Sequence, residues 1–260
     1  QGQRADCAAG LNFIEGGRKL PMKQMRDYAD ERHKGWCIHC NAVLGSVESN
    51  LDHVPSKTIL DRPFPNDLPT VRICKSCNTS FSNDEEYFTA FLGSVLAGSA
   101  DPDQQVVARS EKILRSNYRL QDEIDSQLQI VKDAEGNDQI TFVPDMAKIQ
   151  NVVVKNARGH VLFEHGQPAE GEPARVAIQP IPTLSPDILA NFETIDYGAG
   201  WPEVGSRLMQ RLVTGDDMRP DGWVVVQPNV YRFAVMDQGQ FVVRTVIREY
   251  LATEVAWDRI

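Results

Sequence analysis

The chain has 260 residues, of which 42% are hydrophobic, and a formal net charge of −9 at pH 7. A chain of this length and composition can bury one good core, or one core and a small appended module. The charge argues against a protein that coats nucleic acid by charge alone, because such binding is mostly neutralisation of phosphates. The acidity is uneven, since residues 1–81 carry 11 Lys and Arg against 9 Asp and Glu, and residues 82–260 carry 16 against 27.

The sequence carries no sign of membrane insertion or secretion. No apolar run approaches the roughly 18 residues needed to span a bilayer, and the N-terminal residues lack the basic and apolar regions of a signal peptide. Four of the five cysteines form two C-x-x-C pairs, which in a reducing compartment favours metal binding over disulfides. We therefore expect a cytoplasmic protein without a membrane partner, in which the fifth cysteine, Cys7, is an unremarkable thiol.

Three segments follow one another along the chain. Residues 1–33 are predicted to form a lead-in with a short helix from about Met22 to Arg32. Residues 34–98 form a cysteine-bracketed module in which four prolines allow only short strands and loops at first. Residues 99–260 are predicted to be an α+β region, with helices first and antiparallel strands later.

The end of the module is predicted to be helical. Ser82-Asn83-Asp84-Glu85 has the form of a capping box, and the apolar residues that follow recur at helical spacing as far as Ala97, where Gly98 closes the helix. Acidic residues at a helix N-terminus stabilise the helix dipole. We therefore assign Asp84, Glu85 and Glu86 to this role and not to metal binding.

A second helix is predicted from about Gln104 to Asp125. Its basic residues fall on one broad face: Arg109, Lys112, Arg115 and Arg119. This face could track a phosphate backbone, or it could be a solvated surface interspersed with acidic residues. Both interpretations remain open from the sequence.

The remaining elements alternate between strands and one helix. A hairpin is predicted at residues 128–132 and 139–143, and a helix follows in which Ile149, Val153, Ala157 and Val161 step by four. Residues 166–187 are rich in proline and are interpreted as a connector or lid around one short strand-like run, 175–179. Strands are then predicted at 223–227, 230–236 and 240–248, with a tight turn at 237–239.

The most informative stretch lies between two cysteine pairs. Cys37 and Cys40 form the first C-x-x-C pair, and Cys74 and Cys77 form the second. Two such pairs, a few tens of residues apart, are typical of a closed four-thiolate site of the kind that Zn²⁺ prefers in structural roles. We therefore predict a structural zinc held by these four residues, with His39 as a loop residue.

Between the pairs stand Asp52-His53 and Asn66, and Asn78 follows the last cysteine directly. In isolation, an Asp-His pair indicates only a polar loop or a buried histidine. Within these cysteines, residues 36–82 resemble the HNH endonucleases of the ββα-metal fold, in the zinc-stabilised variety with the order C-x-x-C, D-H, N and C-x-x-C-N. The resemblance implies an α+β protein in which a ββα-metal nuclease module with structural zinc precedes helices and a small antiparallel β-sheet.

The resemblance also implies a role for each matching position. His53 matches the general base that takes a proton from the attacking water, a task that suits an imidazole with a pKa near neutrality. Asp52 and Asn78 match the two protein ligands of one catalytic Mg²⁺ or Mn²⁺, a hard cation that prefers oxygen ligands. Asn66 matches the middle asparagine, which holds the loop that carries the general base.

The sequence departs from the family pattern in two ways. Many members have His at the position of Asn78, so this chain would be an H-N-N variant that retains an oxygen ligand. The family often has Lys shortly afterwards, and residues 79–81 supply none. Lys57 matches another basic position near the first motif, where it would contact substrate phosphate or stand as a solvated loop lysine.

Two functions from different classes follow. The first is a metal-dependent endonuclease that acts on DNA. The alternative is a catalytically inactive, zinc-stapled module that binds nucleic acid or protein. The acidic region after residue 82 has no recognised chemistry. By analogy with the effector nucleases of bacterial defence systems, we expect it to dock a sensor or regulatory subunit.

Overall fold

The structure is a computed structural model that describes residues 31–132, 135–198, 202–215 and 217–258. Cys7 and most of the helix predicted at 22–32 lie outside these residues. A 3-10 helix at Glu31–Gly35 is the first described element.

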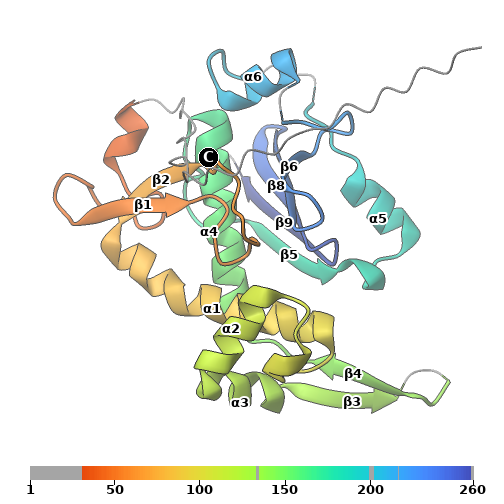
Figure 1. The fold of residues 1–260 in the computed structure, drawn as a ribbon. Helices are drawn as coiled ribbons and strands as arrows, with labels where there is room; N and C mark the ends of the chain where they lie inside the picture. The colour runs from red at the N-terminus through yellow and green to blue at the C-terminus, as the bar shows by residue number, and fades with distance from the viewer. Residues whose placement is uncertain (1–30, 133–134, 199–201, 216, 259–260) are drawn as a thin grey trace, which may run out of the picture.

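Two short strands and a long helix form the N-terminal part of the structure (Figure 1). They are β1 (Ser49–His53), β2 (Thr70–Cys74) and α1 (Lys75–Ala97). The strands pair antiparallel, with Asp52 opposite Val71 and His53 opposite Thr70. The short strands and loops predicted for this region are therefore confirmed.

The helix begins earlier than the capping-box pattern predicts. Cys74 is the N-cap of α1, and its Sγ accepts a hydrogen bond from the backbone N–H of Cys77. Ser82 lies inside the helix, where its hydroxyl donates to the carbonyl of Asn78 one turn earlier. The predicted start was wrong because the cysteine supplies the cap, whereas the predicted end is confirmed by Gly98 in the left-handed conformation.

The single helix predicted over 104–125 is two helices, α2 (Ala108–Ser116) and α3 (Tyr118–Ser126), after a 3-10 turn at Pro102–Gln104. Asn117 interrupts the helix with φ −132° and ψ 82°. Its side-chain oxygen then accepts from the N–H of Leu120, which caps the new helix. A short polar side chain that competes for backbone hydrogen bonds explains the break.

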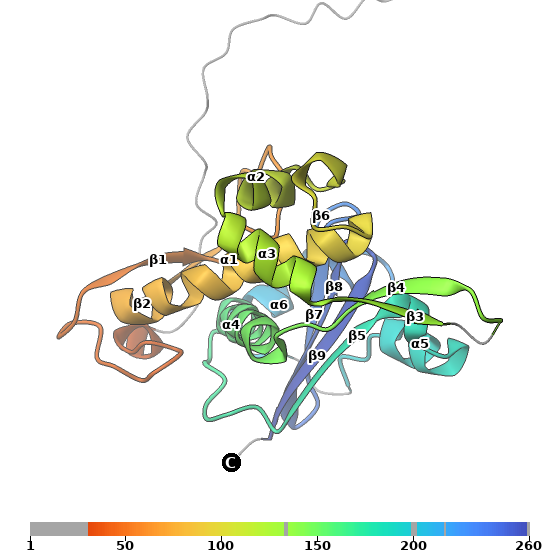
Figure 2. The ribbon, with the colours of Figure 1, turned by 90° about the horizontal axis from the view of Figure 1, so that it is seen from below.

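The predicted hairpin and the helix after it are confirmed. They are β3 (Leu128–Lys132), β4 (Asp138–Phe142) and α4 (Met146–His165). Figures 1 and 2 show α4 in the middle of the molecule, beside α1 and against the five-stranded sheet. None of the described helices is long and apolar enough to cross a membrane.

Gly159 allows α4 to approach the segment that follows β1. A Cβ at this position would lie 2.6 Å from Cγ2 of Val54, the residue after His53. Glycine destabilises a helix interior by about 1 kcal/mol relative to alanine. A larger residue at position 159 would clash with the buried Val54 side chain.

The C-terminal half contains one antiparallel sheet of five strands in the order β5-β9-β8-β7-β6. Its strands are β5 (Arg175–Pro180), β6 (Val224–Gln227), β7 (Tyr231–Asp237), β8 (Gln240–Ile247) and β9 (Leu251–Asp258). The predicted strands correspond to β6, β7 and β8. The strand-like run at 175–179 is confirmed as β5, but its assignment to a connector was wrong, because β5 is the edge strand of the sheet beside β9. Helices α5 (Pro186–Glu193) and α6 (Arg207–Thr214) were not predicted.

One hydrophobic core joins these parts. The same cluster of buried residues includes Leu60 from the loop between β1 and β2, Phe88 from α1, Val152 from α4 and Val243 from β8. The protein is therefore a mixed α+β structure in which the predicted segments 34–98 and 99–260 pack against each other.

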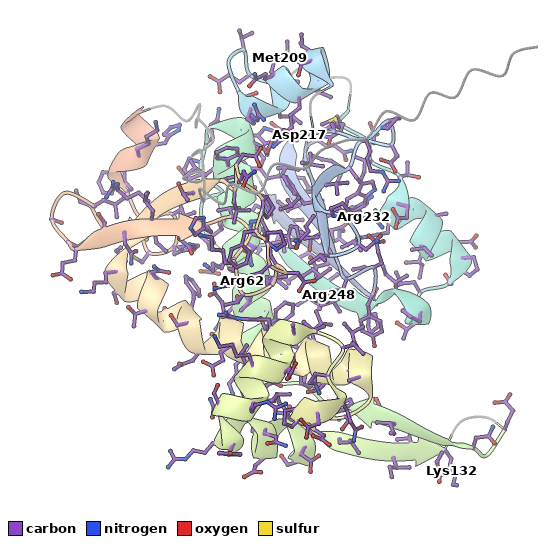
Figure 3. The ribbon with its side chains drawn as sticks, viewed as in Figure 1. Arg62, Lys132, Met209, Asp217, Arg232 and Arg248 are labelled. Atoms are coloured by element: carbon purple, nitrogen blue, oxygen red, sulfur yellow. The ribbon has the colours of Figure 1, made fainter. Side chains whose placement is uncertain are left out.

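The loop between β1 and β2 is also fixed to the sheet by polar contacts. Arg248, whose position at the centre of the molecule is labelled in Figure 3, donates to both carboxylate oxygens of Asp61 and to the carbonyl of Ile59. The side chain of Gln227 accepts from the N–H of Asp61 and donates to its carbonyl. The C-terminal strands thus position a loop of the N-terminal module.

Candidate functional site

The four cysteines predicted to bind zinc come together. Their sulfur atoms all lie within 4.8 Å of one another, and Sγ of Cys40 is 3.6 Å from Sγ of Cys74. A tetrahedral Zn²⁺ with bonds of about 2.3 Å requires sulfur atoms roughly 3.8 Å apart, so the arrangement fits this ion. Among the described residues, no other group of three or more His, Cys, Asp or Glu side chains gathers in this way.

Local structure explains the cluster. Cys37 and Cys40 stand in the turn closed by the bridge between Trp36 and Val43. Cys74 ends β2 and Cys77 lies in the first turn of α1. The four cysteines are therefore positioned to hold a metal ion, and their arrangement is compatible with structural zinc.

The electrostatics of the cluster favour a thiolate at Cys74. Burial raises the pKa of this thiol, but hydrogen bonds from the Cys77 N–H and from the neighbouring thiols outweigh burial and lower the pKa to about 7. Metal binding requires deprotonated thiols. His39 is not part of the group, and burial, followed by the charges of Arg158 and Lys155, lowers its pKa to about 3.

A buried lysine holds the carboxylate of Asp52. Lys155 of α4 lies 103 residues further along the chain, and its Nζ is 2.9 Å from Oδ2 and 3.0 Å from Oδ1 of Asp52. The same ammonium contacts Oε1 of Glu85 on α1 and lies 2.8 Å from the hydroxyl of Ser56. Only 2% of the Lys155 side chain is exposed, against 14% for Asp52 and 15% for Glu85. The Lys155 ammonium of α4 therefore contacts β1, the loop between β1 and β2, and α1.

Further hydrogen bonds complete this cluster. The Ser56 hydroxyl donates to Glu85, and the Ser56 N–H donates to Oδ1 of Asn156. The amide nitrogen of Asn156 in turn donates to the carbonyl of Val152 within α4. Burial raises the pKa of Asp52, and the adjacent Lys155 ammonium opposes this effect.

The acidic residues of α1 do not have the capping role expected from the sequence. They lie well inside the helix, since α1 begins at Lys75. Glu85 binds Lys155, whereas the carboxylates of Asp84 and Glu86 accept hydrogen bonds from Asn151 and Asn117 respectively. The prediction was wrong because it followed from the wrong helix start.

His53 ends β1, next to this cluster. Its Nδ1 is buried and has no hydrogen-bond partner among the residues that the structure describes. Burial, followed by the charges of Lys57 and Lys155, lowers its pKa below the ordinary value of 6.5. The imidazole is therefore mainly neutral at pH 7.

The remaining predicted residues are more exposed. Asn78 is half-buried in the first turn of α1, and Asn66 is exposed in the loop between β1 and β2. Within the described ranges, no hydrogen bond of either side chain is found, so the role of Asn66 in holding the loop stays a prediction. Lys57 is half-buried, with its Nζ 5.5 Å from the ring centre of Phe64.

Sequence reasoning missed Lys155, Asn156 and Glu85 as partners of the site. A signal was present for the first two. Lys155 and Asn156 follow three valines within a helical pattern and continue the face that carries Val152, where an exposed charge is not expected. A buried lysine requires a partner, but no sequence feature shows that the partner is Asp52.

Comparison of the chain with family models, with curated proteins and with solved structures found no match.

Proposed function

We propose that the protein is a metal-dependent endonuclease that hydrolyses phosphodiester bonds in DNA. One observation carries this proposal: two antiparallel strands lead directly into a helix, with Asp52-His53 at the end of the first strand and Asn78 in the first turn of the helix. This is the order that the resemblance to HNH endonucleases implies. The cysteine cluster joins the second strand to that helix and supports the same assignment.

His53 is the proposed general base. It accepts a proton from the water that attacks the phosphorus atom, and its lowered pKa keeps it in the neutral form that this step requires. Because only the neutral imidazole is active, the cleavage rate is expected to fall with decreasing pH through a limb that lies below pH 6.5.

Asp52 and Asn78 are the proposed ligands of one Mg²⁺ or Mn²⁺. The surroundings of Asp52 attract a further cation, because the carboxylates of Asp52 and Glu85 face the single Lys155 ammonium and leave a net negative charge, and carboxylate oxygens have several acceptor positions. When bound, a divalent ion would stabilise negative charge on the phosphate and the leaving oxygen. Lys155 holds the Asp52 carboxylate in place from α4.

The test is cleavage of supercoiled plasmid by the purified full chain with Mg²⁺ or Mn²⁺. The wild type is expected to nick the plasmid, and His53→Ala is expected to slow this reaction about 10²- to 10⁴-fold, the usual contribution of a general base. His33→Ala is the matched control, since His33 hydrogen-bonds the carbonyl of Gly166 and has no proposed catalytic role. Equal cleavage by the wild type and His53→Ala would remove the assignment.

One observation favours the alternative of a zinc-stapled binding module without catalysis. Both oxygens of Asp52 already contact the Lys155 ammonium, and this contact competes with a metal ion. The alternative predicts salt-sensitive DNA binding with no cleavage at any concentration of Mg²⁺ or Mn²⁺. A metal titration of plasmid cleavage distinguishes the two functions.

A further inference from the structure

A polar pocket of about 400 Å³ lies between α1 and α2, next to the Lys155 cluster. Ser82, Glu85 and Glu86 form its wall on α1. Arg109 and Lys112 lie on its α2 wall together with Ile113 and Ser116, and Thr58 of the loop between β1 and β2 completes the lining.

The pocket adjoins the candidate site through one shared residue. Glu85 belongs to both, because it lines the pocket and contacts the ammonium that holds Asp52. Ser82 lies one helical turn after Asn78, on the same face of α1. At a rise of 1.5 Å per residue, the α1 wall of the pocket lies roughly 6 to 12 Å from Asn78 along the helix axis.

The acidic residues of the pocket already have partners. Glu85 binds Lys155 and Ser56. Glu86 accepts a hydrogen bond of 3.1 Å from the side chain of Asn117. Neither carboxylate is ion-paired with the two cations across the pocket.

Arg109 and Lys112 are the unpaired charges of α2. Neither forms an ion pair with a carboxylate in the described part of the chain, and Nε of Arg109 is buried there without a hydrogen-bond partner. Arg115 on the same helix differs, since it binds Asp103 at 2.7 Å and Glu111 at 3.0 Å. Of the four basic residues predicted to share one face, Arg115 is therefore a paired surface residue, and Arg109 and Lys112 line a pocket. Arg119 belongs to the next helix, α3.

We propose that Arg109 and Lys112 bind a backbone phosphate of the DNA strand a few nucleotides away from the bond that is cut. This inference rests on the proposed nuclease function. Arg109 stands in the first turn of α2, whose N-cap Val107 supplies no side-chain hydrogen bond, so the positive end of the helix dipole adds to the attraction. With phosphates about 3.4 Å apart along the axis of each strand, the pocket holds a phosphate about two to four nucleotides from Asn78.

The uneven charge of the chain strengthens this inference. Residues 82–260 carry 16 Lys and Arg against 27 Asp and Glu, so most of this region repels DNA. Two unpaired cations beside the candidate site would direct the strand along α1.

The test measures binding of a fluorescein-labelled 30-base-pair DNA duplex to the zinc-loaded full chain, without added Mg²⁺ or Mn²⁺, from about 50 to 200 mM salt. Arg109→Ala and Lys112→Ala are each expected to weaken binding and to reduce the slope of log affinity against log salt by about one unit. Lys112→Arg is expected to retain the slope. Arg115→Ala is the control on the same helix and is expected to leave the slope unchanged. Zinc content and thermal unfolding verify that each variant folds.

The outcomes separate this inference from the proposed function. If the wild type cuts DNA but Arg109→Ala and Lys112→Ala keep the wild-type slope, the pocket inference is wrong and the nuclease stands. An equal loss of slope in Arg115→Ala would also overturn the inference, because general surface charge would then explain the binding. If the wild type neither binds nor cuts DNA, the proposed function itself fails.

Discussion

Lys155 links the Asp52 carboxylate of the candidate site to α1 and α4. It is almost fully buried, and its partners come from two other elements, Asp52 of β1 and Glu85 of α1. A buried ion pair adds little net stability when it is complete, but removing one partner is costly because a charge is left without compensation. The ammonium therefore matters mainly for keeping two carboxylates close together without strong repulsion.

Lys155→Met is expected to destabilise the protein by about 3 kcal/mol, because Asp52 and Glu85 would face each other in a buried site. Denaturant unfolding measures the change. The double variant Glu85→Gln, Lys155→Met should lose less unfolding free energy than the sum of the losses in the two single variants. The expected coupling free energy is about 1 kcal/mol or more.

Lys132→Met is the control for this prediction. Lys132 lies at the far end of the β3–β4 hairpin (Figure 3), where its pair with Asp138 is well exposed. Its replacement is expected to change stability by less than about 0.5 kcal/mol. If Lys155→Met were as stable as Lys132→Met, the ion pairs described for Lys155 would not exist in solution.

At the scale of elements, a single residue at the junction between β2 and α1 has three structural roles. Cys74 ends the strand, caps the helix and belongs to the four-cysteine cluster. A metal bound there would fix the direction in which α1 leaves the sheet. Asn78, in the first turn of α1, would be positioned by the same contact.

Loss of the metal is therefore expected to destabilise this junction. Elemental analysis of the purified chain should find one zinc per molecule, and Cys77→Ala should lose it. Removal of a structural zinc costs several kcal/mol, which corresponds to a melting temperature lower by roughly 10 °C for a chain of this size. Cys7→Ser, which changes a cysteine outside the described residues, should retain the zinc. An unchanged melting temperature in Cys77→Ala would contradict a structural role.

Elements specified by neighbouring residues could be predicted from the sequence. The short strands of the cysteine-bracketed module, the β3–β4 hairpin and the helix that ends at Gly98 all follow from local sequence patterns. The start of α1 could not be predicted, because its N-cap is Cys74, whereas the capping-box pattern pointed to Ser82. Cysteine is not among the residues that usually cap helices. Helix α5 was missed because Ser185-Pro186 was counted as connector, although Pro is favourable in the first turn of a helix.

The candidate site also combines residues that a local sequence pattern reveals with residues that only the fold brings together. Asp52 and His53 are adjacent in sequence, so their pattern could be recognised directly. Lys155 reaches them from α4 through packing that depends on the whole core, and no local pattern specifies which carboxylate it meets.

At the scale of the whole molecule, the C-terminal sheet supports the loop that leads from β1 to β2. Arg248 adopts a positive φ of 55° and donates hydrogen bonds to Asp61 and Ile59 of that loop. Lys57 and Asn66 lie in the same loop. The C-terminal half therefore contributes to the geometry of the candidate site, even though the residues proposed for catalysis belong to the N-terminal part.

Arg248→Ala is expected to loosen this loop. Charge-assisted hydrogen bonds contribute about 1.5 to 3 kcal/mol, so the variant should be destabilised by roughly this amount. Hydrogen exchange in residues 59–68 of the variant should also become faster than in the wild type, whereas exchange in α2 should stay the same.

Arg219→Ala is the control for Arg248→Ala, because the pair of Arg219 with Asp221 is substantially exposed. Unchanged exchange in residues 59–68 of Arg248→Ala would show that the hydrophobic contacts of the loop suffice to hold it.

The contact between Gly159 and Val54 makes two distant positions interdependent. Because the two residues share one small volume next to His53, a larger residue at one position is compatible with folding only when the other becomes smaller. In a library that randomises both positions, we expect the functional clones to pair small with large residues and to avoid two large ones. Selection on such a library would therefore reveal, from sequences alone, that α4 packs against the end of β1.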